Sequence, residues 1–204
     1  MLTSDFLLEV WLPSIAATIR PSTFTGYRGH VVNHIAPHLG ATPLDLLNGP
    51  AINSVLNTLL DHGNCKRRGA LSPVTVRRVY ATLHRALGDA VRWGLLDKNP
   101  ADACDPPRCS TPSRMSTWDV YELRRFLDVA RGHRLHALWF LLATTGLRRG
   151  EALGLKWRCV DLERGTISIV ETIIAVGNRI QSSAPKSARG EASGCPGQSH
   201  RAGT

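Results

Sequence analysis

Long apolar runs are missing from this sequence of 204 residues. A transmembrane helix needs about 20 consecutive apolar residues, and no stretch approaches that length. The first ten residues carry Asp5 and Glu9 but no basic cluster, which excludes a secretory signal peptide. The sequence therefore predicts a cytoplasmic protein without a membrane partner.

Metal-binding patterns are also missing. The five cysteines form no Cys-x-x-Cys pair and no zinc-finger spacing, so we expect reduced thiols. His30, His34 and His38 are four residues apart, but Pro37 should break their helix, and no carboxylate or cysteine completes a ligand set. We therefore expect no metal and no cofactor, and we place these imidazoles on a face toward DNA or solvent.

Acidic residues are scarce relative to basic ones. Lys and Arg total 25 and Asp and Glu total 16, which gives a formal net charge of +9 and a pI of about 10.0. This balance favours a polyanionic partner, with nucleic acid ahead of an acidic membrane surface. The length allows one large domain or two small ones.

Apolar residues recur at helical spacing through the first half of the chain. The first expected helix is short or kinked because Pro13 interrupts it, and the second should end before Pro37, since a proline pushes the preceding residue out of the helical region. The expected helices cover residues 5–19, 21–36, 51–62 and 74–93. They predict a helical bundle as the first domain, residues 1–98.

The helix over residues 74–93 has the clearest pattern. On a helical wheel its apolar residues share one side, and basic residues share the other, interrupted only by Asp89. The loop over residues 63–71 adds further cations. The candidate DNA-binding residues are Lys66, Arg67, Arg68, Arg77, Arg78, His84, Arg85 and Arg92. They indicate contact with the phosphates of double-stranded DNA, and the alternative is a solvated basic surface.

The second half has a different organisation. Residues 99–115 are rich in proline and small polar residues, which is typical of a domain linker. A second domain should follow over residues 116–189, and a polar tail over residues 190–204. Its expected elements are a capped helix over 120–130, a buried helix over 135–143, strands over 166–170 and 173–176, and a turn at Gly177-Asn178. The fold class is mainly α with a small β-hairpin or sheet.

The stretch Thr145-Gly146-Leu147-Arg148-Arg149-Gly150-Glu151 places two arginines where a helix begins. The positive end of the helix dipole disfavours cations there, so an anion should lie beside them. A turn at Gly146 and the fork of Arg148 would make a phosphate-sized site, in which Glu151 orients the guanidinium. The alternative is an ordinary basic helix start with a surface ion pair.

Together with Trp157, Val160-Asp161-Leu162 and Gly165-Thr166-Ile167, this stretch resembles the first catalytic box of the tyrosine recombinases, the phage integrase family. The resemblance implies that Arg148 is the first catalytic arginine, Glu151 the acidic residue of the box, and Lys186 the catalytic lysine of a β-hairpin. It also implies that the N-terminal bundle is a core-binding domain, which clamps one side of the duplex.

The family cleaves and rejoins DNA through a covalent intermediate. A tyrosine attacks the scissile phosphorus to form a phosphotyrosyl bond. Two arginines and a histidine hold the phosphate oxygens, and the lysine protonates the leaving 5′ oxygen. The expected function is therefore site-specific recombination or integration of DNA, with possible self-association on DNA and no small-molecule substrate.

Several features of the family are absent. No histidine has an arginine three residues later, and Tyr27, Tyr80 and Tyr121 all precede Arg148, so none matches the nucleophile. Residues 190–204 contain no large apolar side chain and should be disordered. We expect a C-terminally truncated member that binds DNA but cannot cut it alone. The alternatives are a non-catalytic helical DNA-binding or regulatory protein and a remnant without activity.

Overall fold

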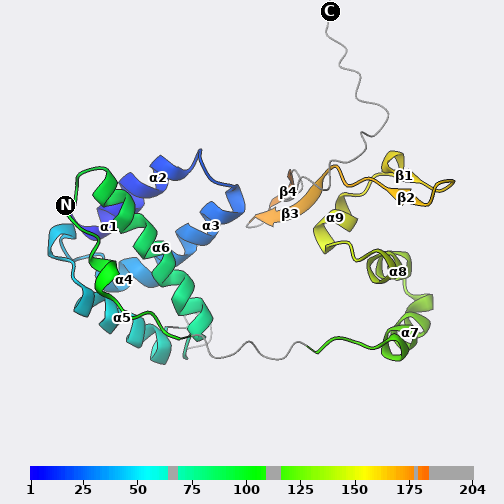
Figure 1. Cartoon of the computed structure of the whole chain (residues 1–204), viewed down its shortest axis with the longest axis horizontal. Coiled ribbons are helices and arrows are strands. Elements are labelled where there is room, and N and C mark those ends of the chain that lie inside the picture. The colour runs from blue at the N-terminus through cyan, green and yellow to red at the C-terminus, as the bar shows by residue number, and fades with distance from the viewer. Residues whose placement is uncertain (64–68, 109–115, 177–178, 184–204) are drawn as a thin grey trace, which may run out of the picture. The chain divides into compact units, whose positions relative to one another are not determined.

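The computed structural model describes residues 1–63, 69–108, 116–176 and 179–183. The chain divides into two compact units, Met1–Arg114 and Met115–Thr204 (Figure 1). Within these described residues, no helix has the length and apolar character needed to cross a bilayer.

The first helical stretch of unit 1 follows one continuous path. Helix α1 (Thr3–Asp5), the π-helical turn η1 (Phe6–Trp11) and α2 (Leu12–Ile15) succeed one another without a break. Pro13 lies in the first turn of α2, where its missing N–H is tolerated because the preceding turn is wide. The expected helix is therefore confirmed, and Pro13 marks a change of helix type within it.

The second helical stretch corrects one prediction. Helix α3 (Pro21–His30) continues through a π-helical turn, η2 (Val31–Ile35), into α4 (Ala36–Leu39), so the helix does not end before Pro37. The N–H of Ala36 bonds to the carbonyl of Val31, five residues back. This shift to wider hydrogen bonding accommodates the proline ring, which would clash in a regular α-helix.

The two remaining large helices of unit 1 each begin at a side-chain cap. The Asn48 side chain accepts a hydrogen bond from the Ala51 N–H (3.0 Å) at α5 (Gly49–His62), and the Ser72 hydroxyl accepts one from the Thr75 N–H (3.2 Å) at α6 (Pro73–Arg92). A short 3-10 turn, η3 (Leu44–Leu46), precedes α5. Helix α6 packs against α3, α5, η1 and η2.

The core of unit 1 is a single apolar cluster. Its fully buried large side chains come from η1, η2, α5 and α6 and include Phe6, Leu7, Trp11, Val31, Ile35, Ile52, Leu59, Val76, Val79 and Leu87. Helix α6 contributes the apolar side predicted from its wheel pattern, so that prediction is confirmed.

The predicted linker begins too early. Residues Pro100–Ala103 form a 3-10 turn, η4, and both Ala101 and Cys104 belong to the core cluster. The Tyr80 hydroxyl donates to the carbonyl of Ala101 at 3.0 Å. Proline and small residues suit a tight turn as well as a linker, and here they close the bundle.

The described part of unit 2 has five helical segments, of which three are α-helices and two are 3-10 turns. Helix α7 (Val120–Val129) begins at a capping box between Asp119 and Glu122 and runs into the 3-10 turn η5 (Ala130–Gly132). Helix α8 (His136–Thr145) and helix α9 (Arg149–Gly154) follow, and the 3-10 turn η6 (Trp157–Cys159) leads into the strands.

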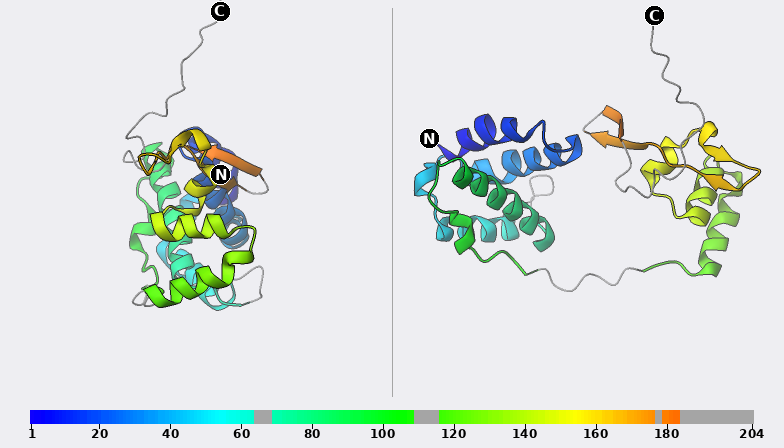
Figure 2. Two further views of the ribbon diagram at one scale, coloured as in Figure 1. Left: turned by 90° about the vertical axis from the view of Figure 1, so that its right-hand side faces the viewer. Right: turned by 45° about the horizontal axis from the view of Figure 1, so that its top comes forward.

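The strands of unit 2 form two antiparallel pairs (Figure 2). Strand β1 (Val160–Asp161) pairs with β2 (Thr166–Ile167), and β3 (Thr172–Val176) pairs with β4 (Arg179–Ser183). The second pair is the hairpin predicted around residues 177–178. The first strand run was expected over residues 166–170 but stops at Ile167, and β1 was not expected.

Unit 2 buries little of its apolar surface. No residue of α8 is buried, which contradicts the expected buried helix, and the Phe140 side chain is 51% exposed. Trp157, Leu162 and Val129 are 83%, 79% and 82% exposed. The described part of this unit lacks a second layer to cover these side chains, so an apolar sequence pattern is not matched by burial.

The two cysteines within the described residues, Cys104 and Cys159, differ from each other. Cys104 is a buried free thiol, as expected, whereas Cys159 is disulfide-bonded, so the expectation of reduced thiols is wrong for Cys159.

Candidate nucleic-acid interface and arginine site

The arginine stretch forms a turn followed by a helix start. Helix α8 ends at Gly146, whose φ of 68° lies in the left-handed region that glycine adopts without strain. Arg148 is the N-cap residue of α9, and Arg149 is its first helical residue. The turn predicted at Gly146 is confirmed, and it sets Arg148 at the surface with its side chain 74% exposed.

Glu151 holds Arg148 from two directions. Its carboxylate accepts the backbone N–H of Arg148 at 2.9 Å and the guanidinium Nη1 at 3.0 Å. The backbone hydrogen bond, followed by the one from the side chain, lowers the pKa of Glu151 below its usual value. Glu151 is therefore a carboxylate at neutral pH, and it leaves most guanidinium donors of Arg148 directed outward.

The β3–β4 hairpin lies directly on α9. A Cβ atom added to Gly150 would lie 2.6 Å from the carbonyl oxygen of Ile173, and one added to Gly154 would lie 2.7 Å from that of Glu171. These two glycines, four residues apart, form a flat side of α9 against which β3 can approach. The contact fixes the hairpin against the helix that Arg148 begins.

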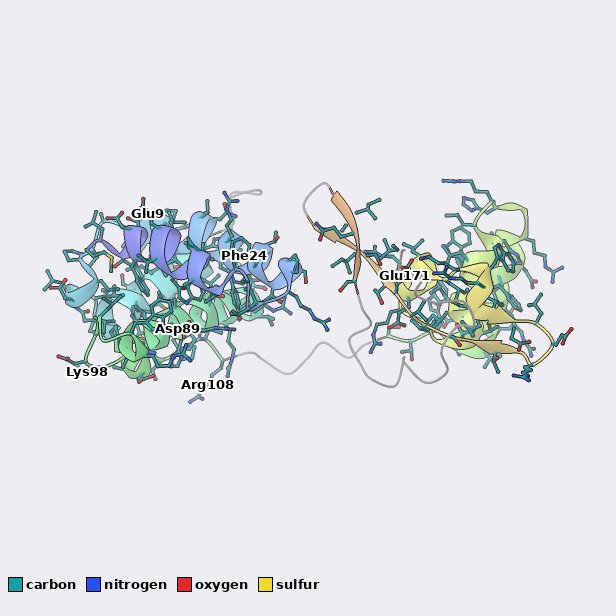
Figure 3. The ribbon with its side chains drawn as sticks, turned by 90° about the horizontal axis from the view of Figure 1, so that it is seen from above. Glu9, Phe24, Asp89, Lys98, Arg108 and Glu171 are labelled. Atoms are coloured by element: carbon teal, nitrogen blue, oxygen red, sulfur yellow. The ribbon has the colours of Figure 1, made fainter. Side chains whose placement is uncertain are left out.

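A polar bridge strengthens this contact. The Lys156 ammonium and the Glu171 carboxylate are 2.9 Å apart, and the Ser182 hydroxyl donates to the same carboxylate at 3.2 Å. The bond from Lys156 is the largest cause that lowers the pKa of Glu171. Glu171 thus joins the segment after α9 to strand β4, at the position labelled in Figure 3.

Lys186 lies outside the described residues, as do Lys66, Arg67 and Arg68. Their roles remain predictions. Ser183, the last described residue of β4, pairs with Thr172 of β3. The Thr172 methyl group would lie 2.7 Å from a Cβ atom at Gly150, so it is close to the start of α9. The chain therefore leaves the hairpin at the level of the first turn of α9.

The basic residues of α6 are exposed but differ in their partners. His84 and Asp102 are 2.7 Å apart, and Arg92 pairs with Asp89. Arg85 donates from Nη1 to the Tyr27 hydroxyl at 3.0 Å. The side chains of Arg77 and Arg78 make no hydrogen bond or ion pair with any residue in the described ranges.

The helical wheel placed Asp89 among the basic residues of α6, but the structure does not. Asp89 is 6% exposed and accepts a hydrogen bond from the indole N–H of Trp11 at 2.7 Å. The side chain therefore points into the bundle and leaves the outer side of α6 basic.

The histidines of α3 and η2 also differ from the prediction. His30 is partly buried, and its Nδ1 contacts the Thr82 hydroxyl of α6 at 2.8 Å. That hydroxyl already donates to the carbonyl of Arg78, so His30 Nδ1 is the donor in this contact. The described residues contain no cluster of side chains that could hold a metal ion.

An apolar cavity of about 430 Å³ lies beside the arginine helix. Its lining includes Leu138, Leu141, Leu155 and Trp157, but neither Arg148 nor Glu151. The cavity is therefore separate from the pair formed by Arg148 and Glu151.

Tyr27 is a polar partner of α6 that the wheel analysis did not identify. Tyr27 lies four residues before Val31 and eight before Ile35, so the sequence spacing already placed it on the inward side of the second helical stretch.

Comparisons with known proteins agree with this architecture. Residues 5–60 match the family described as the phage integrase N-terminal SAM-like domain. A tyrosine recombinase XerC-like protein of Caldanaerobacter subterraneus subsp. tengcongensis is 29% identical over 174 residues, which is 82% of this chain and 43% of the relative. An integrase of Saccharopolyspora erythraea is 28% identical over 174 residues, 84% of this chain and 38% of the relative. The chain thus spans less than half the length of these curated relatives.

Solved structures share the fold. The Tn1549 transposon integrase in complex with circular intermediate DNA matches with a TM-score of 0.69 at 17% identity, over 90% of this chain and 59% of that one. A lambda integrase dimer bound to a COC′ core site matches with a TM-score of 0.66 at 18% identity, over 90% of this chain and 62% of that one. Together with the sequence matches, these findings show that the chain shares the fold of phage integrases and is similar in sequence to tyrosine recombinases.

Proposed function

We propose that this chain binds double-stranded DNA as part of a site-specific recombinase, with the outer side of α6 as its main backbone contact. One observation carries the proposal: α6 buries most of its apolar side in the core and turns its arginines outward. Arginines on a rigid helix match phosphate oxygens in geometry and charge. The DNA in the integrase complexes named above supports the same partner here.

Arg148 is proposed as the first catalytic arginine, oriented by Glu151 toward a scissile phosphate. The contacts at 2.9 and 3.0 Å support this role because they fix the guanidinium while leaving donors free. Lys186 is proposed as the hairpin lysine. Two residues lie between it and Ser183, and three residue steps span at most about 10 Å, which is enough to reach the N-terminus of α9 from the end of β4.

Cleavage needs a nucleophile that this sequence does not place after Arg148. All three tyrosines precede it, and Tyr80 donates its hydroxyl to the core carbonyl of Ala101. The activity proposed for this chain alone is therefore DNA binding without cleavage. Self-association on DNA, a cytoplasmic location and the absence of a small-molecule substrate are further parts of the proposal.

Salt-dependent DNA binding tests the proposal. The slope of log K against log salt is negative, and each lost phosphate contact makes it shallower by about 0.9. Replacing Arg77, Arg78 and Arg85 together by Ala should therefore make it shallower by up to about 2.7. Unchanged binding by this triple variant would exclude α6 as the interface.

A suicide substrate tests the catalytic part. We expect no covalent adduct from this chain, and an adduct would show that a tyrosine within it acts as nucleophile. If the chain is instead a non-catalytic DNA-binding protein, Arg148→Ala should leave its affinity nearly unchanged for generic DNA and for core-site DNA alike. In the recombinase reading, Arg148→Ala weakens contact at the scissile phosphate selectively.

A further inference from the structure

The contact between α3 and α6 contains a row of polar pairs. Tyr27 of α3 meets Arg85 of α6, and His30 of α3 meets Thr82 of α6. The later residue on one helix pairs with the earlier residue on the other, so the two helices run antiparallel here. These polar contacts between α3 and α6 can set the orientation of a side chain on the outer side of α6, and Arg85 is such a side chain.

Arg85 is held by a single ring in two ways. Its Nη1 donates to the Tyr27 hydroxyl at 3.0 Å, and its guanidinium carbon lies 5.4 Å from the centre of the same ring. Both contacts restrict the guanidinium without neutralising it, because phenol is uncharged at neutral pH.

The ring of Tyr27 is itself anchored in the core. It packs on the indole of Trp11 with ring centres 5.7 Å apart, and Trp11 is fully buried. The indole N–H of Trp11 is in turn bonded to Asp89 at 2.7 Å. The orientation of Arg85 is therefore tied, through Tyr27 and Trp11, to the buried core of the bundle.

This combination distinguishes Arg85 from the other cations of α6. Arg92 and His84 face the carboxylates of Asp89 and Asp102, which offset their charge. Arg77 and Arg78 keep their charge, but no hydrogen bond or ion pair within the described ranges fixes their side chains. Of these five residues, Arg85 alone combines full charge with a fixed orientation.

We propose that Tyr27 is a positioning residue that holds Arg85 ready for a DNA phosphate, which makes Arg85 the strongest single contact on α6. The proposal rests on the proposed function, since it presumes that α6 faces DNA. Ordering one long side chain on binding costs about 0.5–1.5 kcal/mol, so a pre-ordered arginine gains about two- to tenfold in affinity.

The test uses the full chain and a double-mutant cycle of Tyr27→Phe and Arg85→Ala, read as DNA affinity at several salt concentrations. Tyr27→Phe should weaken binding about two- to tenfold without changing the salt slope, because the cation remains. Arg85→Ala should make the slope shallower by about 0.9 and weaken binding more than Arg77→Ala does. In the Arg85→Ala background, Tyr27→Phe should have no further effect.

Tyr80→Phe is the matched control. It removes a hydroxyl hydrogen bond from a tyrosine of α6, the helix that carries Arg85, so a loss of affinity caused only by lower fold stability would appear there too. Thermal unfolding of each variant separates the two effects.

Three results would overturn the assignment. Unchanged affinity of Tyr27→Phe would show that the hydroxyl does not position Arg85. An equal loss in the Arg85→Ala background would show that Tyr27 touches DNA itself. Equal losses from Arg85→Ala and Arg77→Ala would remove the special role of Arg85. If none of the α6 variants changes binding, the proposed interface fails as well, which distinguishes the two proposals.

Discussion

The indole N–H of Trp11 donates to the carboxylate of Asp89 at 2.7 Å, across 78 residues of sequence. Trp11 is fully buried and Asp89 is 6% exposed, so the bond forms inside the bundle, where η1 meets α6. The second carboxylate oxygen of Asp89 pairs with Arg92. One acidic side chain thus satisfies a buried donor and a surface cation together.

Replacing Asp89 by alanine should destabilise unit 1 by about 3 kcal/mol. The change leaves the buried indole N–H without a partner and removes a charge-assisted pair, and each loss costs on the order of 1–3 kcal/mol. Urea unfolding measures the effect. Asp97→Ala is the control because Asp97 is exposed, and a loss as large there would refute the role of the Trp11 contact.

The example of Asp89 shows what a wheel pattern can and cannot predict. The pattern correctly predicted the apolar and basic sides of α6, because burial of apolar surface dominates helix packing. It could not place Asp89, which lies at the boundary between the two sides. Its direction depends on Trp11, a residue of another helix that sequence spacing does not bring near.

The prolines and the β3–β4 hairpin also show which features the sequence can predict and which depend on distant contacts. The end of a helix before Pro37 was a sound local expectation, and it failed because two π-helical turns, η1 and η2, widen the helices near their prolines. The turn at Gly146 and the capping residues Asn48, Ser72 and Asp119 were predictable because they act locally. The packing of the hairpin against Gly150 was not predictable, because it depends on contact between segments that are distant in sequence.

Stability should fall as pH drops below about 6.5. Burial is the first cause that lowers the pKa of both His30 and His34 from the usual 6.5, and the charges of His34 and Arg78 add to it for His30. The unfolded chain then binds more protons than the folded one below pH 6.5, so stability increases with pH until that value and is constant above it.

Chemical unfolding between pH 5 and pH 8 measures this dependence. Replacing His30 and His34 together by Gln should flatten the slope, whatever the change in absolute stability. His62→Gln, at an exposed position on α5, is the control variant and should leave the slope as it is, because His62 does not contribute to the lowered pKa of His30 or His34. A wild-type stability that is flat across this range would contradict the assignment.

Gly150→Ala should destabilise unit 2 by about 1–3 kcal/mol. The new methyl group would lie 2.6 Å from the carbonyl oxygen of Ile173, so α9 and β3 must separate. Gly132→Ala is the matched control, because a Cβ there meets no atom within 4 Å. Hydrogen exchange of the β3 amides reports the separation, and equal protection in both variants would show that the hairpin does not depend on this contact.

The two units should unfold separately, unit 2 first. The core cluster of fully packed aromatic and aliphatic side chains belongs entirely to unit 1, whereas α8 buries no residue and Phe140 is half exposed. At about 25 cal/mol per Å² of apolar surface removed from water, this difference leaves unit 2 with little to offset its chain entropy. Hydrogen exchange of the full chain should show strong protection in α5 and α6 and weak protection in α7 and α8. A single cooperative transition with uniform protection would instead mean that the two units stabilise each other.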